Sequence, residues 1–474
     1  MKPADIDSEL VDANPWWRTP EGWEASDVQL RAARRSPLAY EPRPLRDAER
    51  GGLYVLRGPR RVGKSTAIKQ FISEWLRDGA PPRTVVHLSV EGRSAQDLVD
   101  IVRRCRAEWL DGQPGDRLWV FDEITGVQGP WPEHIKRLRD QDPSFSADTV
   151  VLTGSSSSQF DEARKLLAGR RSAERSDRTM FQLSFLDVAR ALGQELPAPP
   201  GLQVADLQDR RTVKEAAIEY KPWQDVLIAA WDRYLRVGGY PQAVAAELRA
   251  PGEAAEERVL AGALWDVIHG DAFAGSELTH TQTQAILRSL SDSLGSLLSV
   301  RKVATETSLH HTTVEKRLDT LRRSFVAFPV QREQGLAPKA RSQSKWYFTD
   351  PRLARLASDF GAGTPPDPTQ LSEQQIALAL LRALEEEWPG AAVRHDRLLY
   401  YRSATKAEID FVSASFPAAC VESKYVDHGW ARAFQTIEAS GRSMGIVATR
   451  SGSQRHDGGW ALPAALVAFL LSHE

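Results

Sequence analysis

Short apolar runs alternate with amphipathic segments between residues 51 and 160. Each run is apolar almost throughout, and each is followed by a segment with apolar residues at helical spacing. Because a strand covered on both faces is apolar along its whole length, this alternation predicts an α/β fold with a parallel sheet between helices. The predicted strands are 53–58, 84–90, 117–124 and 149–156, and the predicted helices are 64–79, 94–112 and 131–141.

The pattern changes on both sides of this region. The first residues are rich in proline and tryptophan, as in NPWWRTPEGW, which favours an extended arm that packs onto the next domain. We expect an arm over 1–40, the α/β core over 41–222, a helical region over 223–290, a helix-turn-helix and strand over 291–344, and mixed strands and helices over 345–474.

The composition is that of an ordinary globular protein, and the length of 474 residues suggests about three domains. We find neither an apolar run of ~18 residues nor the apolar core of a secretion signal, so we expect no membrane span. Cys105 and Cys420 lie far apart and form no metal pattern, which favours the reducing cytoplasm. The net charge is only −2, so a nucleic-acid partner would require a local basic face.

The stretch GPRRVGKS, residues 58–65, is the strongest chemical signal in the chain. It has the spacing of a phosphate-binding P-loop, follows an apolar strand and opens a helix. Glycines let the backbone N–H groups turn toward a phosphate, and the helix N-terminus adds a favourable dipole. Lys64 is expected to reach the β- and γ-phosphates of ATP, and the Ser65 hydroxyl to ligate Mg²⁺. The predicted ATP-binding residues of the loop are Gly58, Pro59, Arg60, Arg61, Val62, Gly63, Lys64, Ser65 and Thr66.

An acid pair, Asp122 and Glu123, ends the predicted strand 117–124. Ligands of open α/β sheets bind at the carboxyl ends of the strands, so the pair is expected beside the P-loop. Asp122 would hold Mg²⁺ through water, and Glu123 would orient and deprotonate the attacking water. The alternative is a helix cap after a buried strand. The next strand ends in hydroxyls, and Thr153 or Ser155 would contact the γ-phosphate or the water, unless they form a simple polar turn.

The segment LLAGRRS, residues 167–173, offers Arg170. An arginine supplied by a neighbouring subunit can stabilise the charge of the transition state, although basic loops are usually only solvated.

The ordered set GPRRVGKST, FDEI followed by Trp131, LTGSSS, LAGR and GGYP resembles the widespread bacterial and archaeal AAA-like ATPases. Their C-terminal half is a restriction-endonuclease-like domain of unknown function. The resemblance covers about residues 36–474 and implies an AAA-type core, a helical lid over 223–290, a homo-oligomeric ring or partial ring, and Arg170 as the arginine finger. The NPWW arm is less typical of the family, and its role is not assigned.

Residues 299–330 read as helix, tight turn, helix and strand, which is a winged helix-turn-helix. This segment contains six basic residues and three acidic ones, and its second predicted helix begins with short polar side chains. Contact with DNA phosphates is one interpretation, and packing against protein is the other. The basic residues are Arg301, Lys302, Lys316, Arg317, Arg322 and Arg323.

Near the end of the chain stands IDFVSASFPAACVESK, residues 409–424. Two strands would place Asp410 beside Glu422, and Lys424 on the same face as Glu422. Two carboxylates can bind Mg²⁺ or Mn²⁺ and activate water, with Lys424 offsetting charge. With Glu373 from an upstream helix, the order resembles the PD-(D/E)xK nuclease superfamily. The usual proline is replaced by Glu408-Ile409, and polar residues on a hairpin, or a fold that has lost its chemistry, are the alternatives.

Three functions follow from these patterns. The first is a cytoplasmic, oligomeric AAA-type ATPase that hydrolyses ATP with Mg²⁺ and acts on duplex or branched DNA. The second is an ATP-controlled switch that acts on protein partners. The third is an ATP-regulated, metal-dependent DNA nuclease, with a second Mg²⁺ or Mn²⁺ in the C-terminal domain.

Overall fold

A computed structural model of the chain describes residues 3–110, 112, 115–155, 158–273, 278–394 and 396–473. The chain forms two units, Met1–Met180 and Phe181–Glu474. The boundary therefore falls inside the segment 41–222 that we expected to be one core. Residues after the boundary belong to the second unit because their apolar side chains are buried in it. The ring of Phe185, for example, lies 5.0 Å from that of Trp231.

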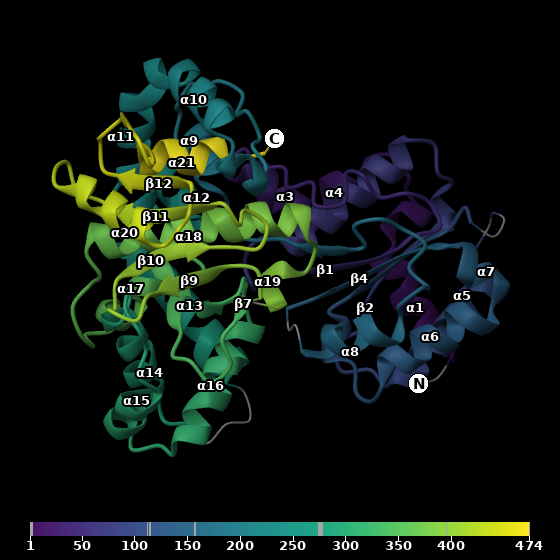
Figure 1. Cartoon of the computed structure of the whole chain (residues 1–474). Helices are drawn as coiled ribbons and strands as arrows, with labels where there is room; N and C mark the ends of the chain where they lie inside the picture. The colour runs from purple at the N-terminus through teal and green to yellow at the C-terminus, as the bar shows by residue number, and fades with distance from the viewer. Residues whose placement is uncertain are drawn as a thin grey trace. The chain divides into compact units, whose positions relative to one another are not determined.

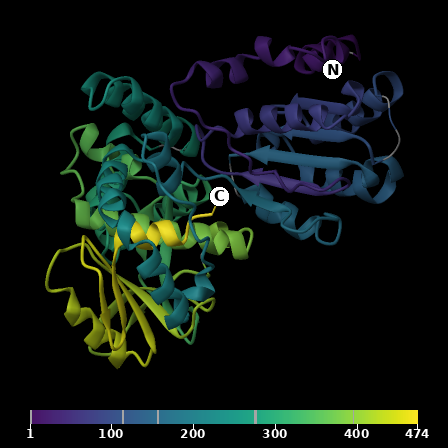
Figure 2. The ribbon, with the colours of Figure 1, turned by 90° about the horizontal axis from the view of Figure 1, so that it is seen from above.

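The first unit contains a five-stranded sheet in the order β2-β3-β4-β1-β5, with every pair parallel. Figures 1 and 2 show helices on both sides of this sheet. This confirms the predicted α/β fold with a parallel central sheet. The strands are β1 Leu53–Arg57, β2 Val85–Ser89, β3 Leu118–Asp122, β4 Thr149–Gly154 and β5 Asp177–Thr179. The helices are α4 Lys64–Arg77, η2 Pro82–Thr84, α5 Ala95–Glu108, η3 Ile124–Gly126, α6 Trp131–Gln141, α7 Pro143–Ala147 and α8 Ser158–Leu166.

The arm before the sheet is helical, and our expectation of an extended arm was wrong. Local capping explains part of the difference, because the Asp27 side chain accepts from the N–H groups of Gln29 and Leu30 and starts a helix. Proline is also compatible with the first turn of a helix, where no N–H partner is needed. The elements are α1 Pro3–Ala13, η1 Pro15–Trp17, α2 Trp23–Ser26 and α3 Val28–Arg35.

The arm packs against β2, the edge strand of the sheet. The indole N–H groups of Trp16 and Trp17 donate to the carbonyl of Val85, at 3.1 and 2.8 Å. The side chain of Asn14 accepts from the N–H of His87 at 2.6 Å and donates to its carbonyl at 3.0 Å. These contacts satisfy backbone groups that an open sheet edge leaves unpaired.

Helices form the first part of the second unit, including the segment 223–290 that we expected to be helical. The helix α11 packs against α9, α17, α18 and α21. The residues expected to form a lid thus contribute to the core of the second unit. The elements up to residue 292 are α9 Phe185–Ala191, η4 Val204–Gln208, α10 Arg210–Glu219, η5 Lys221–Trp223, α11 Gln224–Val237, α12 Pro241–Arg249, α13 Ala254–Asp266, the π-helix η6 Val267–Ala272 and α14 His280–Asp292.

Two short helices form the region expected to be a helix-turn-helix. The Ser299 side chain caps α15, Val300–Thr307, and Ser308 adopts a left-handed φ of 56° before α16, His311–Arg323. The strand β6, Ala327–Gln334, follows.

A nine-stranded sheet runs through the rest of the unit, in the order β13-β14-β12-β11-β10-β9-β6-β7, with β8 paired to β6. Because β6 pairs with both β8 and β9, the expected boundary between 344 and 345 lies inside one sheet. The helices α18 and α21 lie along this sheet in Figure 1. The strands are β7 Ala337–Pro338, β8 Lys345–Phe348, β9 Leu399–Arg402, β10 Glu408–Val412, β11 Ala419–Lys424, β12 Met444–Thr449, β13 Gln454–His456 and β14 Gly459–Pro463. The helices are α17 Pro351–Asp359, α18 Pro368–Glu387, α19 Ala391–Arg394, η7 Trp430–Arg432, α20 Ala433–Ala439 and α21 Ala464–Leu470.

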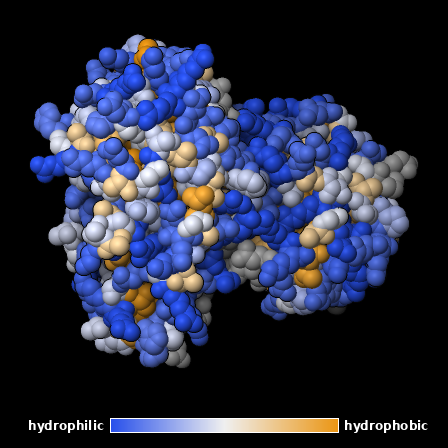
Figure 3. All heavy atoms as spheres, in the orientation of Figure 1, coloured by the Kyte–Doolittle hydropathy of each residue, from blue (hydrophilic) through white to orange (hydrophobic). Residues whose placement is uncertain are grey.

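The face of the molecule in Figure 3 is mainly hydrophilic, with apolar side chains in small scattered groups. Within the described ranges, we find no helix long and apolar enough to span a membrane.

Candidate nucleotide site and acid–lysine cluster

The loop after β1 has the backbone shape that its glycines permit. Gly58 has a φ of 154°, and a Cβ at this position would lie 2.0 Å from the carbonyl oxygen of Met180. Gly63 and Arg61 are left-handed, with φ values of 96° and 67°. A glycine at 58 is therefore required by the close approach of the next chain segment, and α4 begins directly after the loop at Lys64.

The Lys64 ammonium is buried inside this loop. Its Nζ donates to the carbonyls of Gly58 at 2.9 Å and Pro59 at 2.8 Å. Burial lowers the pKa of Lys64 to about 8, although Glu123 and Asp122 favour its charged form. Because a charge-assisted bond to an anion is stronger than a bond to a neutral carbonyl, a buried cation held in this way is suited to bind a phosphate.

Asp122 and Glu123 lie at the carboxyl end of β3, on the same sheet edge as the loop. Asp122 Oδ1 accepts from the Glu123 N–H at 3.1 Å and from the Thr153 hydroxyl at the end of β4. Burial would raise the pKa of Asp122, but the nearby His87 ring and Thr153 hydroxyl lower it to about 2. Asp122 is thus an anion at neutral pH.

Glu123 is left-handed, with a φ of 55°, so the extended backbone of β3 ends at this residue. Burial raises the pKa of Glu123, while Lys64 lowers it. The structure therefore brings together Lys64, Asp122, Glu123 and Thr153, four residues singled out from the sequence.

His87 is a residue of this site that our sequence reasoning missed. Its Nε2 lies 3.9 Å from Oδ2 of Asp122, and its Nδ1 lies 3.5 Å from Nζ of Lys69. Burial lowers the pKa of His87. The available signal was a histidine, the one ionisable residue inside the mainly apolar run 84–90.

The other loop residues differ in exposure. Val62 is fully buried, Arg61 is exposed, and Arg60, Ser65 and Thr66 are half-buried. Ser155 directly follows β4 and is also half-buried. The two serines after it, 156 and 157, lie outside the described residues.

Arg170 lies at the N-terminal ends of the strands, whereas the loop lies at their carboxyl ends. Its backbone carbonyl accepts from Arg139, which also binds the carbonyl of Gly51 just before β1. The Arg170 guanidinium forms an ion pair with Asp140 at the end of α6. A role for Arg170 at the loop of its own subunit is therefore inconsistent with this placement.

In the second unit, the four residues of the predicted nuclease-like site meet in one cluster. Asp410 on β10 and Glu422 on β11 are linked by a hydrogen bond of 2.9 Å from the Asp410 N–H to Glu422 Oε2. Lys424 Nζ lies 2.6 Å from Glu422 Oε1. Burial, together with the charge of Asp410, raises the pKa of Glu373 to about 7 and that of Glu422 to about 8.

The centre of this acid–lysine cluster is Lys345 on β8, which we did not single out. Its side chain is 1% exposed, and its Nζ lies 2.6 Å from Asp410, 2.8 Å from Glu408 and 3.4 Å from Glu373. The hydroxyl of Tyr347 donates to Glu373 at 2.6 Å. Burial alone would lower the pKa of Lys345, but the acidic groups around it raise that pKa. The signal in the sequence was KWYF, a lysine in an otherwise aromatic strand.

In two carboxylates of this cluster, those of Asp410 and Glu422, both oxygens already bind a protein donor. Both oxygens of Asp410 accept from nitrogen donors, Nζ of Lys345 and the N–H of Ser423 at 2.9 Å. Both oxygens of Glu422 are occupied in the same way, by Lys424 and by the Asp410 N–H. A divalent cation at these oxygens would have to compete with a protein cation or amide that each of them already binds. In the part of the chain that the structure describes, no group of three or more His, Cys, Asp or Glu side chains is arranged to hold a metal.

A family model matches the part of the chain that contains the five-stranded sheet. Residues 50–189 match a family model described as an AAA domain. The chain therefore contains an AAA domain with a P-loop, as the resemblance implied. Residues 228–363 match a model described as a domain of unknown function. No curated protein matches the chain.

Two solved structures resemble the chain at 12% identity. One is the ORC2 protein of Aeropyrum pernix in ADPNP-ADP complexes, with a TM-score of 0.33 over 70% of this chain and 93% of that chain. The other is CDC6P from Pyrobaculum aerophilum, with a TM-score of 0.24 over 72% of this chain and 93% of that chain. Both scores are low, so the AAA assignment rests on the family model and the sheet topology.

Proposed function

We propose that this protein is a Mg²⁺-dependent ATPase that works as an oligomer and acts on DNA. The observation that carries the ATPase part is the buried Lys64 ammonium at the same sheet edge as the carboxylates of Asp122 and Glu123. A triphosphate would supply an anion in direct contact with Nζ of Lys64, which here donates to two neutral carbonyls. The backbone of 58–63 has the shape that approaches a phosphate closely.

The roles of the residues follow from their positions. Lys64 binds the β- and γ-phosphates, and the loop N–H groups orient them. Asp122 and the Ser65 hydroxyl would hold Mg²⁺, which when bound neutralises phosphate charge. Glu123 has a raised pKa and lies beside Asp122, so it is suited to accept a proton from an attacking water. Thr153, already bound to Asp122, fixes that carboxylate.

The test is steady-state ATP hydrolysis by the purified protein. Lys64→Ala and Glu123→Gln should each reduce the rate by roughly 100-fold or more, because each removes charge or proton transfer at the reacting group. Lys165→Ala, at an exposed position of α8, is the matched control and should retain the wild-type rate. An unchanged rate in either site variant would refute the assignment.

The DNA part is supported by α15 and α16, whose basic residues lie on a helix-turn-helix followed by strands. Duplex, branched and single-stranded DNA should be added to the same assay at fixed low salt. A several-fold rise with one form supports the proposal. An ATP hydrolysis rate that does not change with any form of DNA would favour the alternative, an ATP-controlled switch that acts on protein partners.

The nuclease alternative has one favourable observation, the convergence of Glu373, Asp410, Glu422 and Lys424. Lys345 weighs against it, because its ammonium already pairs with Asp410, one of the two carboxylates that would bind the metal. Mn²⁺-dependent cleavage of DNA that is lost in Glu422→Ala would support a nuclease. Cleavage that survives this change would indicate a contaminant.

A further inference from the structure

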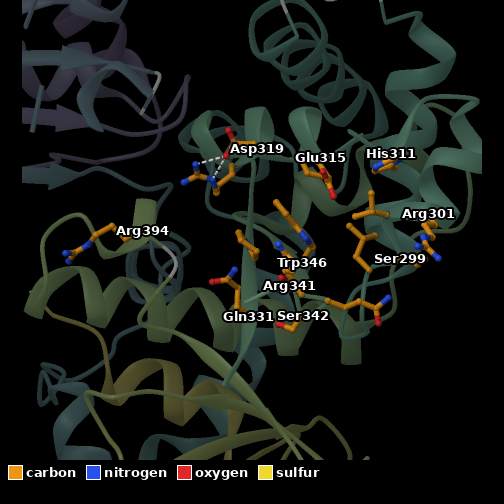
Figure 4. Close-up of a pocket in the computed structure, with 17 residues that line it drawn as sticks. Ser299, Arg301, His311, Glu315, Asp319, Gln331, Arg341, Ser342, Trp346 and Arg394 are labelled. Carbon is orange, nitrogen blue, oxygen red and sulfur yellow. Dashed lines mark hydrogen bonds and ion pairs between the residues drawn. The ribbon is translucent and has the colours of Figure 1, made fainter. Parts of the chain in front are cut away.

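A groove opens between the helix-turn-helix and the hairpin formed by β6 and β8. It has a volume of about 870 Å³ and is lined from α15, α16, β6, β8 and the turn before β8. Figure 4 shows Trp346 in the middle of this groove, with His311, Glu315 and Asp319 of α16 on one side and Gln331 and Ser342 on the other.

The alternation of side chains along β8 explains why Trp346 faces the groove. Lys345 and Tyr347 are buried and bind the carboxylates of the acid–lysine cluster, so the residue between them points to the opposite side of the strand. Trp346 pairs with Pro329 of β6, and both residues line the groove. The indole is half-buried, and among the described residues we find no ring stacked on it. Part of a large aromatic side chain is thus exposed to the groove.

The charges around Trp346 favour an anion. Arg301 and Arg341 line the groove and are exposed, and neither forms an ion pair with a described residue. Of the two acidic residues that line it, Asp319 is neutralised by Arg322 at 2.6 Å and by Arg323 at 2.5 Å, which leaves Glu315. In the view of Figure 4, Arg301 and Arg394 lie at opposite ends of the groove, with Trp346 between them. The positive charge in the groove that no described acidic residue neutralises therefore comes from Arg301 and Arg341.

The remaining polar groups suit the edge of a base. Gln331 and Gln343 bring carboxamides, which both donate and accept hydrogen bonds, and Ser342 and Ser344 bring hydroxyls. A concave site that combines an aromatic face, amides and arginines has the features that bind unstacked bases with their phosphates. A base pair within a duplex cannot stack on Trp346, because both of its faces are already covered by neighbouring pairs.

We propose that this groove binds a single strand of DNA, with one base stacked on Trp346 and phosphates at Arg301 and Arg341. The proposal rests on the DNA part of the proposed function and names its substrate as the unpaired strand. It also gives the turn before β8 a role, since Arg341 adopts a left-handed φ of 56° there and its side chain lines the groove.

The experiment is fluorescence anisotropy with the full chain and a labelled 20-nucleotide oligo(dT), beside a hairpin duplex of the same length. Trp346→Ala should weaken binding of oligo(dT) by roughly 10-fold or more, and Trp346→Phe should restore much of it, because a base can stack on either ring. Arg301→Ala and Arg341→Ala should each reduce the slope of log affinity against log salt by about 0.7. Trp388→Ala is the matched control, a tryptophan that is 44% exposed and does not line the groove, and should bind like the wild type.

Binding of oligo(dT) that is unchanged in Trp346→Ala and in both arginine variants would overturn the proposal, as would a duplex bound as tightly as the single strand. The arginine variants keep the test valid if Trp346→Ala fails to fold, since both arginines are exposed. Basal ATP hydrolysis by the wild-type protein without DNA reports on the proposed function separately. A protein that hydrolyses ATP but binds oligo(dT) independently of these residues would refute the groove alone.

Discussion

Nζ of Lys345 lies 2.6 Å from Oδ1 of Asp410, in the interior of the second unit. Two further carboxylates, those of Glu408 and Glu373, approach the same ammonium. A cation therefore stands where a nuclease of this general pattern would need a metal ion, and it joins β8 to β10 and α18.

Loss of this cation should destabilise the protein strongly. Lys345→Met leaves the carboxylates buried without compensation, and we expect the free energy of unfolding to fall by about 3–5 kcal/mol. Urea denaturation would measure the change. Adding Asp410→Asn should recover part of the loss, because it removes one of the uncompensated charges. Lys316→Met, at an exposed position, is the control and should stay within about 0.5 kcal/mol of the wild type.

Removal of Lys345 should also change the metal affinity of the cluster. The wild-type protein should show no Mn²⁺ binding that depends on Asp410, whereas Lys345→Ala frees carboxylate oxygens and should gain such binding. Calorimetric titration of Mn²⁺ into the nucleotide-free protein would measure it, with Asp410→Asn in the Lys345→Ala background as the control. Mn²⁺ binding by the wild type that disappears in Asp410→Asn would contradict this expectation and strengthen the nuclease alternative.

Asp350 should make stability depend on pH. Its carboxylate is fully buried, where it accepts from the N–H groups of Gly239 at 2.7 Å and Arg352 at 2.8 Å. Burial raises its pKa from 3.8 to about 6. The folded state therefore binds more protons than the unfolded state between these values, and the contribution of Asp350 to stability falls as the pH rises from 3.8 to about 6, by roughly 3 kcal/mol.

The measurement is urea unfolding at pH 4, 5, 6 and 7. The stability of the wild type relative to Asp350→Asn should be greatest at pH 4 and should shrink toward pH 7. Asp12→Asn, a substitution at an exposed carboxyl, should leave the pH profile of the wild type unchanged. A difference between wild type and Asp350→Asn that is constant with pH would show that Asp350 has an ordinary pKa.

The arm should support the nucleotide site through β2. Asn14 is fully buried and binds both backbone groups of His87, whose ring lies beside Asp122. Asn14→Ala leaves these groups unsatisfied, and we expect a loss of about 1–3 kcal/mol for each of them. The rate of ATP hydrolysis should fall as well, because His87 then no longer holds its position. Asp12→Ala, an exposed change on α1 two residues before Asn14, should alter neither quantity. Wild-type stability and rate in Asn14→Ala would refute the link.

Arg170 should act on the nucleotide site of a neighbouring subunit in the proposed oligomer. Arg170→Ala and Glu123→Gln should each be nearly inactive alone, whereas a mixture of the two proteins should regain part of the activity. In a mixed oligomer, some interfaces combine an intact Glu123 with an intact Arg170. A mixture no more active than its components would contradict a role in trans. Asp140→Ala, which releases Arg170 from its ion pair, should not reduce the rate.

Local patterns were sufficient for the nucleotide loop and for the sheet around it. Residues Gly58 to Thr66 are contiguous, and Asp122 and Glu123 lie at the end of a single strand. Both groups can therefore be recognised without knowing which distant segments pair. The same reasoning failed for the arm, whose helices depend on the Asp27 cap and on packing against β2. It also placed a boundary at 344, where strands from both sides form one sheet.

The sequence by itself determined an α/β core with a phosphate loop, because the periodicity of apolar residues and the spacing of glycines act within a few residues. Only the tertiary structure decided that Lys345 binds Asp410, 65 residues away in the sequence. It also decided that Trp346, on the opposite side of the same strand, lines a groove. Those outcomes depend on the order and register of strands in the sheet. Strand order is chosen by the packing of the whole unit, and no short segment of the chain carries that information.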